Sequence, residues 1–308
     1  MISGLNPANE QFLASMNDLE SRLNNAQNQL SSGLRVNQAS DAPQEVGDIF
    51  EIRADLGQQN QFIQNLTLVQ SQVNAADSSI QSALQLLDQA ISLGSQGANT
   101  NAVSGQQSIL ATQVQGLEAQ LVALSRTQVG GVYIFSGDNS GSPAYQVDTA
   151  SATGVDRLFV QQATQQISDP AGVTFQVAMT AQDLFDKRDA QDNPAPENAF
   201  AALNSLNLAL QSGDTNAITQ AVGSLRTASN YINQQLGFYG AVENRVSSSL
   251  DLAQKFQVQD QTRLSNLQDA DTTAEALEVT QDTTGLNAAM AAEARRPVTT
   301  LFDYLPLA

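Results

Sequence analysis

The chain of 308 residues carries 31 acidic and 13 basic side chains and has no His, no Cys and no Trp. Without His or Cys it can form no Ser-His-Asp triad, thiolate nucleophile or ordinary zinc site, so we expect no enzyme, cofactor or metal centre. A net charge of -18 repels phosphate groups, which disfavours nucleic acid and membrane surfaces and leaves proteins as the expected partners.

The first predicted element is an amphipathic helix near the start of the chain. Its apolar residues recur at alternating intervals of four and three, as in the seam of a coiled coil. They are Phe12, Met16, Leu19, Leu23, Ala26 and Leu30. Gly33 suits a C-cap, and Pro43, after Ser40 and Asp41, suits the first turn of a second helix. We therefore expect one helix to end near residue 33 and another to begin near residue 43.

Five further helices are predicted, four from the same spacing and the last from its composition. The second predicted helix covers residues 43–94 and, at 1.5 Å per residue, would be roughly 75 Å long. A third apolar run, 110–124, stops at Gly130, and a seam over 218–267 predicts another very long helix. A shorter run at residues 200–210 precedes it, and an Ala-rich tail predicts a last helix over 274–294.

Between these helices the apolar period changes to two, which is typical of strands. The run 132–135 is rich in β-forming residues, 173–179 alternates strictly, and 155–160 is a weaker strand. Turn-forming residues close the region near 196. The sequence therefore predicts a small β-containing insert between long helices.

The predicted fold class is mainly α with a small β-rich insert, arranged as a long antiparallel helical rod with coiled terminal segments. An apolar seam at the start of the chain needs a partner face, and the tail of the chain offers one. We expect a terminal assembly domain of residues 1–40 with 268–308. A helical rod domain would comprise 41–130 with 197–267, and the insert domain 131–196.

Clustered carboxylates are the remaining candidates for chemistry. Four of them recur at intervals of three, which does not match a calcium-binding loop, so we expect a solvated acidic loop. They are Asp183, Asp186, Asp189 and Asp192. The pair Asp269 and Asp271 resembles a metal-nucleotide motif, but we expect these residues to cap a helix boundary.

Five segments together carry a family resemblance. Residues 30–37 (LSSGLRVN) with 40–43 (SDAP) resemble the amino-terminal motif shared by bacterial flagellins and the hook-filament junction proteins called hook-associated protein 3. Residues 131–137 (GVYIFSG) resemble the start of the junction proteins' central β domain. Residues 264–271 (LSNLQDAD) and 301–305 (LFDYL) are similar to the carboxy-terminal motifs. The matching motif positions are Arg35, Asn37, Asp41, Pro43, Asp269 and Asp271.

Within this flagellin superfamily both branches stay open. Pro43 and the ending at 301–305 favour the junction proteins, whereas residues 33–35 are more flagellin-like and Ala42 replaces an Asp that is usual in the motif. A secreted coiled-coil effector or adhesin that binds through the insert is a third, weaker alternative.

The resemblance implies a structural axial protein that joins hook to filament in the extracellular flagellum. Export would use the flagellar type III apparatus with a chaperone and without a cleavable signal peptide. The partners would be identical subunits in a ring, a neighbouring hook-associated protein and flagellin. We predict that the subunits assemble through apolar residues of the terminal helices, namely Phe12, Met16, Leu19, Leu23 and Leu30, with Leu277, Leu286 and Met290 opposite.

Overall fold

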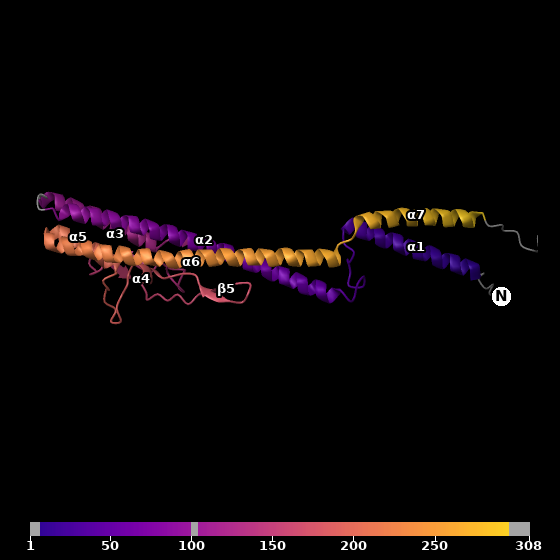
Figure 1. The fold of residues 1–308 in the computed structure, drawn as a ribbon, viewed down its shortest axis with the longest axis horizontal. Helices are drawn as coiled ribbons and strands as arrows, with labels where there is room; N and C mark the ends of the chain where they lie inside the picture. The colour runs from indigo at the N-terminus through magenta and orange to yellow at the C-terminus, as the bar shows by residue number, and fades with distance from the viewer. Residues whose placement is uncertain (1–6, 100–103, 296–308) are drawn as a thin grey trace, which may run out of the picture. The chain divides into compact units, whose positions relative to one another are not determined.

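A computed structural model describes residues 7–99 and 104–295 of the chain, and most of them are helical (Figure 1). The long helices are α1 (Pro7–Ser32), α2 (Val46–Gly97), α3 (Ser104–Ser125), α5 (Ala199–Ser212), α6 (Thr215–Gln268) and α7 (Thr272–Ala294). A single short turn, α4 (Ala181–Leu184), lies within the β-containing region. The predicted fold class, mainly α with a small β-containing insert, is confirmed.

The two longest helices confirm the heptad-based predictions. With 52 and 54 residues, α2 and α6 are each about 80 Å long. The second helix begins three residues after the predicted Pro43, because turns precede it: the Asp41 N–H donates to Gln38 O (3.0 Å) and the Glu45 N–H to Ala42 O (2.9 Å).

The insert contains six very short strands in three separate antiparallel pairs. β1 (Gln128–Val129) pairs with β2 (Val132–Tyr133), β3 (Tyr145–Val147) with β4 (Val155–Arg157), and β5 (Gln166–Ser168) with β6 (Thr174–Gln176). Each predicted strand is thus present only in part. The rest of those runs hydrogen-bonds outside the ladders; for example, the Leu158 N–H donates to Ala144 O (2.9 Å).

The chain divides into two compact units, of residues 1–58 with 256–308 and of residues 59–255. We call them the terminal unit and the central unit. The boundaries fall inside α2 and α6. The three-part division expected from the sequence stays a prediction.

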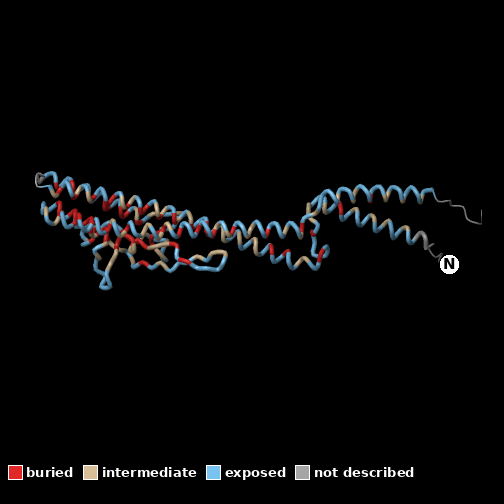
Figure 2. Tube along the Cα trace, in the orientation of Figure 1, coloured by how far each residue is buried: buried red, intermediate tan, exposed pale blue. Residues whose placement is uncertain are grey.

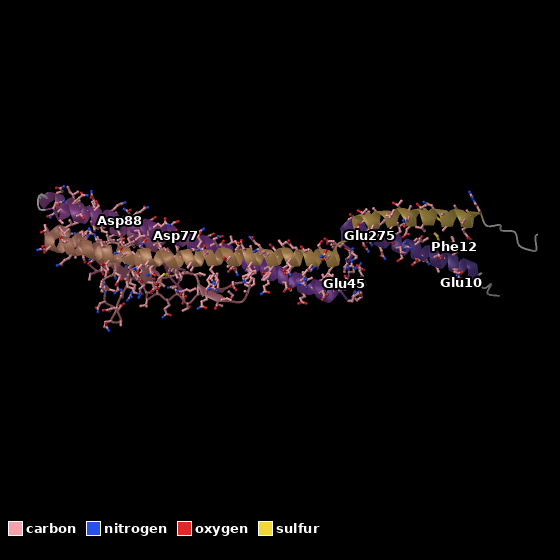
Figure 3. The ribbon with its side chains drawn as sticks, viewed as in Figure 1. Glu10, Phe12, Glu45, Asp77, Asp88 and Glu275 are labelled. Atoms are coloured by element: carbon pink, nitrogen blue, oxygen red, sulfur yellow. The ribbon has the colours of Figure 1, made fainter. Side chains whose placement is uncertain are left out.

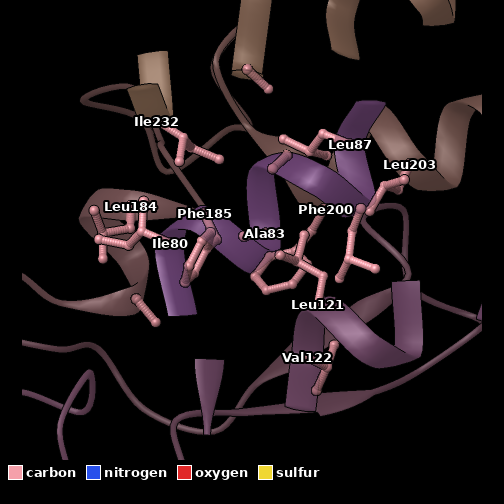
Figure 4. Close-up of a cluster of buried hydrophobic side chains, with 14 of the residues drawn as sticks. Ile80, Ala83, Leu87, Leu121, Val122, Leu184, Phe185, Phe200, Leu203 and Ile232 are labelled. Carbon is pink, nitrogen blue, oxygen red and sulfur yellow. The ribbon is translucent and has the colours of Figure 1, made fainter. Parts of the chain in front are cut away.

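The core of the central unit is one cluster of buried apolar side chains from α2, α3, α5, α6 and the insert (Figures 2 and 4). Two glycines of α2 allow close packing there. A Cβ at Gly94 would lie 2.5 Å from a Val222 methyl group, and one at Gly97 would lie 2.3 Å from a Leu210 methyl group. Aromatic rings of the insert, including Phe185, pack against Phe200 of α5 in the same cluster.

A buried carboxylate holds the insert to this core, and the predicted solvated acidic loop is wrong at this position. Asp186 is fully buried. It accepts hydrogen bonds from Tyr145 Oη (2.9 Å), Arg188 Nε (2.8 Å) and Asn198 Nδ2 (2.6 Å). Burial and the adjacent Asp186 raise the pKa of Tyr145, so the phenol stays a donor. The carboxylate therefore organises structure.

Two side chains of α6 contact residues 175–179 of the insert. Tyr239 Oη accepts from the Met179 N–H (3.1 Å), and the Arg245 guanidinium lies 4.2 Å from the centre of the Phe175 ring. The second contact places a cation over an aromatic face, which is favourable by about 0.5–2 kcal/mol.

In the described part of the chain, no helix is long and apolar enough to span a bilayer.

Candidate assembly site

Helices α1 and α7 lie side by side in the terminal unit (Figure 1). Two contacts show that they run antiparallel. Leu19 packs on Gly285: a Cβ added at this glycine would lie 3.7 Å from Leu19 Cδ2. Arg22, later in α1, contacts Glu278 and Asp282, which come earlier in α7. The predicted pairing of the two ends of the chain is therefore present within one molecule.

The α1 side of this pair largely matches the predicted seam. Phe12, Met16, Leu19 and Leu23 are half-buried, and Ala26 is fully buried. Leu30, in contrast, is 40% exposed, because the chain leaves α1 for Gly33 within one turn. The role of these residues between subunits stays a prediction.

The three predicted assembly residues of α7 differ in exposure, and their role between subunits stays a prediction. Leu286 is half-buried, but Leu277 is 58% and Met290 51% exposed. Leu277 precedes Leu286 by nine residues, which at 100° per residue places it about half a turn away. Leu277 therefore points away from the side of α7 that carries Leu286, and both Leu277 and Met290 leave apolar surface exposed for other contacts.

An ion pair sets the register between α1 and α7. Asp282 is only 3% exposed, and its Oδ1 accepts from Arg22 Nη2 (2.9 Å). Arg22 Nε also donates to Glu278 Oε1 (3.2 Å). Sliding either helix by one residue would leave the buried carboxylate without its cation, which is costly. Sequence reasoning missed Asp282 because it is one of several acidic residues in α7, and nothing in the local sequence marks it as buried.

The two terminal motifs bind each other through the backbone, in what we call the terminal clasp, residues 33–37 with 267–270. Leu34 and Asp269 form an antiparallel bridge. The Arg35 and Val36 N–H groups both donate to Gln268 O (2.7 and 3.3 Å), and the Ala270 N–H donates to Gly33 O (3.0 Å). Gly33 makes the turn possible with a φ of +72°, which favours glycine. Its predicted role at the end of the first helix is confirmed.

Gln268 lies at the centre of the clasp and was not singled out from the sequence. Its side chain donates through Nε2 to Val36 O (3.3 Å) and accepts at Oε1 from Arg53 Nη2 (3.0 Å). A small apolar cluster packs around it. This cluster comprises Val36, Ala42 and Ile49, with Leu264 and Leu267 against them.

The motif residues of the amino-terminal segment mostly serve this clasp. Arg35 donates to Glu45 and to the Leu267 carbonyl. Asn37 donates through Nδ2 to Leu34 O (2.9 Å), and Asp41 accepts from the Asn37 N–H (2.9 Å). Pro43 is exposed in the turns before α2.

The two acidic motif residues of the carboxy-terminal segment differ in role. Asp271 is the N-cap of α7 and accepts from the Thr273 and Ala274 N–H groups, which confirms the predicted cap. Asp269 accepts from Ser265 Oγ at the end of α6. The closing motif at 301–305 lies outside the described residues.

The α1–α7 pair and the terminal clasp form packing contacts and hydrogen bonds. Within residues 7–99 and 104–295, no group of three or more Asp or Glu residues could hold a metal ion. Two contacts hold these parts of the chain together: the hydrogen bonds that join the two clasp segments, and the packing of α1 against α7. The arrangement can build a paired helical surface, with exposed apolar residues left on it.

Comparison with known proteins supports the predicted resemblance. Residues 2–140 match the family described as "Bacterial flagellin N-terminal helical region". A search of curated proteins gave no match.

Several solved structures share the fold. A putative flagellar hook-associated protein from Vibrio parahaemolyticus has a TM-score of 0.64 at 13% identity, covering 74% of this chain and 100% of its own. FlgL from Bacillus cereus has a TM-score of 0.53 at 18% identity, covering 71% and 100%. Flagellar hook-associated protein-3 from Legionella pneumophila has a TM-score of 0.59 at 12% identity, covering 71% and 98%. At these identities the likeness concerns the fold alone.

Proposed function

We propose that this chain is a structural subunit of the bacterial flagellum, a member of the flagellin superfamily that joins the hook to the filament. The observation that carries the proposal is the terminal clasp. It brings the amino-terminal and carboxy-terminal motifs of the resemblance together. It lies where α1 ends and α7 begins, so the two helices leave it as an antiparallel pair. The match to the flagellin family over residues 2–140 supports the same reading.

The proposed mechanism is assembly through the terminal helices. The α1–α7 pair half-buries the apolar side chains between the two helices but leaves other apolar side chains outside it. Leu13, Leu30, Leu277 and Met290 are each at least 40% exposed. Apolar side chains on a solvent-facing helix lower the free energy when another helix covers them, by about 25 cal/mol per Å². Neighbouring copies, flagellin and a further hook-associated protein are the proposed partners, after chaperone-assisted export.

The junction role is preferred over the filament role on the fold. Solved structures with TM-scores of 0.52 to 0.64 include two hook-associated proteins and a flagellar junction protein, FlgL. We further propose that the protein has no enzymatic role, since the described site presents structural contacts.

A deletion strain separates the two flagellar roles. If the chain joins hook to filament, a strain that lacks it should export filament protein into the medium without assembling filaments, and the restored gene should rebuild them. If the chain is the filament protein, the medium of the deletion strain should contain no filament protein. Normal filaments in the deletion strain would contradict both roles.

A further inference from the structure

The turn between β3 and β4, residues 148–154, lies on α3 in the central unit. Its tip is exposed, whereas Thr153 and Gly154 are buried, and β3 lies next to α3. Backbone hydrogen bonds hold the turn together: the Asp148 N–H donates to Gly154 O (3.0 Å) and the Gly154 N–H to Ser151 O (3.1 Å). Because these bonds are internal, the turn can move as one piece.

Beneath this turn lies a carboxyl group without a hydrogen-bond partner. Glu118 of α3 is 2% exposed, and its Oε1 has no partner. The Gly154 backbone is so close that a Cβ there would overlap the Glu118 carboxyl group. An ionised carboxyl group loses its hydration on burial, so the neutral form is favoured in such a site. The turn therefore covers Glu118 at little cost only while the carboxyl group holds a proton.

The charges of the surrounding elements do not compensate an ionised Glu118. The helix α3 carries no other charged residue, and α5, which packs on it, carries none. The charged residues of the β3–β4 hairpin and of the core-facing stretch of α2 are Asp148, Asp156, Arg157, Asp77 and Asp88 (Figure 3). Arg157, the cation among them, donates to Gln182 Oε1 (3.2 Å) and to Asp192. Burial alone raises the pKa of Glu118, so none of these groups offsets it.

One side chain of α5 holds the turn in place from the other side. Asn204 is buried, and its Nδ2 donates to Ser151 O (3.3 Å) and Ala152 O (3.0 Å). When the turn lifts, both carbonyl groups can bond to water instead, so these bonds are exchanged rather than lost. An ionised Glu118 regains its hydration in the same movement, which favours the lifted position.

We propose that the β3–β4 turn is a proton-controlled latch, which is closed on α3 while Glu118 is protonated and opens when Glu118 ionises. The latch couples the surface of the insert to the pH of the surrounding solution. It is a property of the folded chain itself, so it goes beyond the proposed flagellar function and does not depend on it.

The test uses a single introduced thiol, because the chain has no Cys of its own. Thr153→Cys places the thiol on the buried side of the turn, and Thr149→Cys places it at the exposed tip. The rate of reaction of each full-length chain with dithiodipyridine is measured between pH 5 and pH 8. The ratio of the two rates removes the pH dependence of the thiol itself and reports how often the turn is open.

The ratio should rise with pH up to about 7 and then stay level, because the closed turn holds a proton that the open turn releases. A pKa that rises from 4.5 to about 7 on closing corresponds to a change of about 70-fold in the opening equilibrium between pH 5 and pH 8. In the Glu118→Gln background the ratio should not change with pH. Asp156→Asn, which removes a carboxylate from the same hairpin, is the matched control and should keep the rise.

Two further reporters distinguish opening of the turn from unfolding of the chain. Val155→Cys, at a position that is 2% exposed at the start of β4, should show the same rise as Thr153→Cys. Ser125→Cys, at a fully buried position of α3, should react at least about tenfold more slowly than Thr153→Cys at pH 8. Equal rates for these two thiols would mean that the whole unit unfolds, and would overturn the proposal. A ratio that does not change with pH, or the same rise in the Glu118→Gln background, would overturn it as well.

Discussion

Glu118 provides the sharpest test of the central-unit packing. It lies on α3 beneath the turn that joins β3 to β4, and it is 2% exposed. Its Oε1 has no hydrogen-bond partner, and the backbone at Gly154 lies so close that an added Cβ there would overlap the carboxylate. Burial without a compensating charge raises the pKa of Glu118 to about 7 from an ordinary value of 4.5.

The magnitude follows from proton linkage. At 1.36 kcal/mol per pKa unit, this rise corresponds to about 3 kcal/mol between the protonated and ionised carboxyl groups. Because the folded pKa is the higher one, the native state holds the proton that the unfolded chain has released. The free energy of unfolding should therefore fall as the pH rises from about 4.5 to about 7, and stay level above that.

The variant Glu118→Gln keeps the shape and removes the charge. It should match the wild type near pH 4 and exceed its free energy of unfolding by about 2–3 kcal/mol at pH 8. Urea unfolding followed by helical circular dichroism between pH 4 and pH 8.5 measures both curves. Glu243→Gln, at an exposed position of α6, is the control and should change the free energy by less than about 0.5 kcal/mol. A constant difference between wild type and Glu118→Gln across this pH range would refute the reasoning.

Three further substitutions test individual contacts through the free energy of unfolding. Gly154→Ala should cost more than about 2 kcal/mol, since it combines a φ of +74° with overlap on a buried carboxyl group. Gly172→Ala is the control: its φ is +82° but no atom lies near the added Cβ, so it measures the backbone cost alone and should cost about 1 kcal/mol. Equal costs for the two variants would contradict the close approach of Gly154 to the Glu118 carboxyl group. Gln268→Ala should destabilise the terminal unit by about 1–3 kcal/mol, because it leaves the buried Val36 carbonyl without the side-chain donor. The control Gln259→Ala, on the exposed face of α6, should leave the free energy of unfolding unchanged. Gly97→Ala should cost about 1–3 kcal/mol, because its Cβ would lie 2.3 Å from a methyl group of α5, and a neutral result would mean that the helices are further apart.

The helices could be predicted from the sequence because their signals are local. A seam with alternating spacing of four and three sets α1, α2 and α6, and Gly33 and Asp271 mark ends that the backbone itself requires. The tail was harder, since Ala289 contributes little to a hydrophobic pattern and the residues that face α1 include the charged Asp282. Leu277, which the apolar pattern marked for assembly, is exposed within the single chain, and its role between subunits stays a prediction.

The insert and the centre of the clasp could not be predicted in detail for a different reason. Strands of two or three residues contain too few side chains to show a period. Burial of a polar residue such as Asp186, Glu118 or Gln268 depends on groups far away in the chain, and composition alone places such residues on the surface. The resemblance marked the motif segments, and the structure shows that they bind each other.

The most direct test of the central claim is immunogold electron microscopy of intact flagella with an antibody against residues 139–176 of the insert. A structural subunit that joins hook to filament should be labelled in a narrow zone at the hook-proximal base, once per flagellum. Label along the whole filament would make the chain a filament subunit. Absence of label from flagella, with the antibody shown to bind the folded chain, would contradict the flagellar role itself.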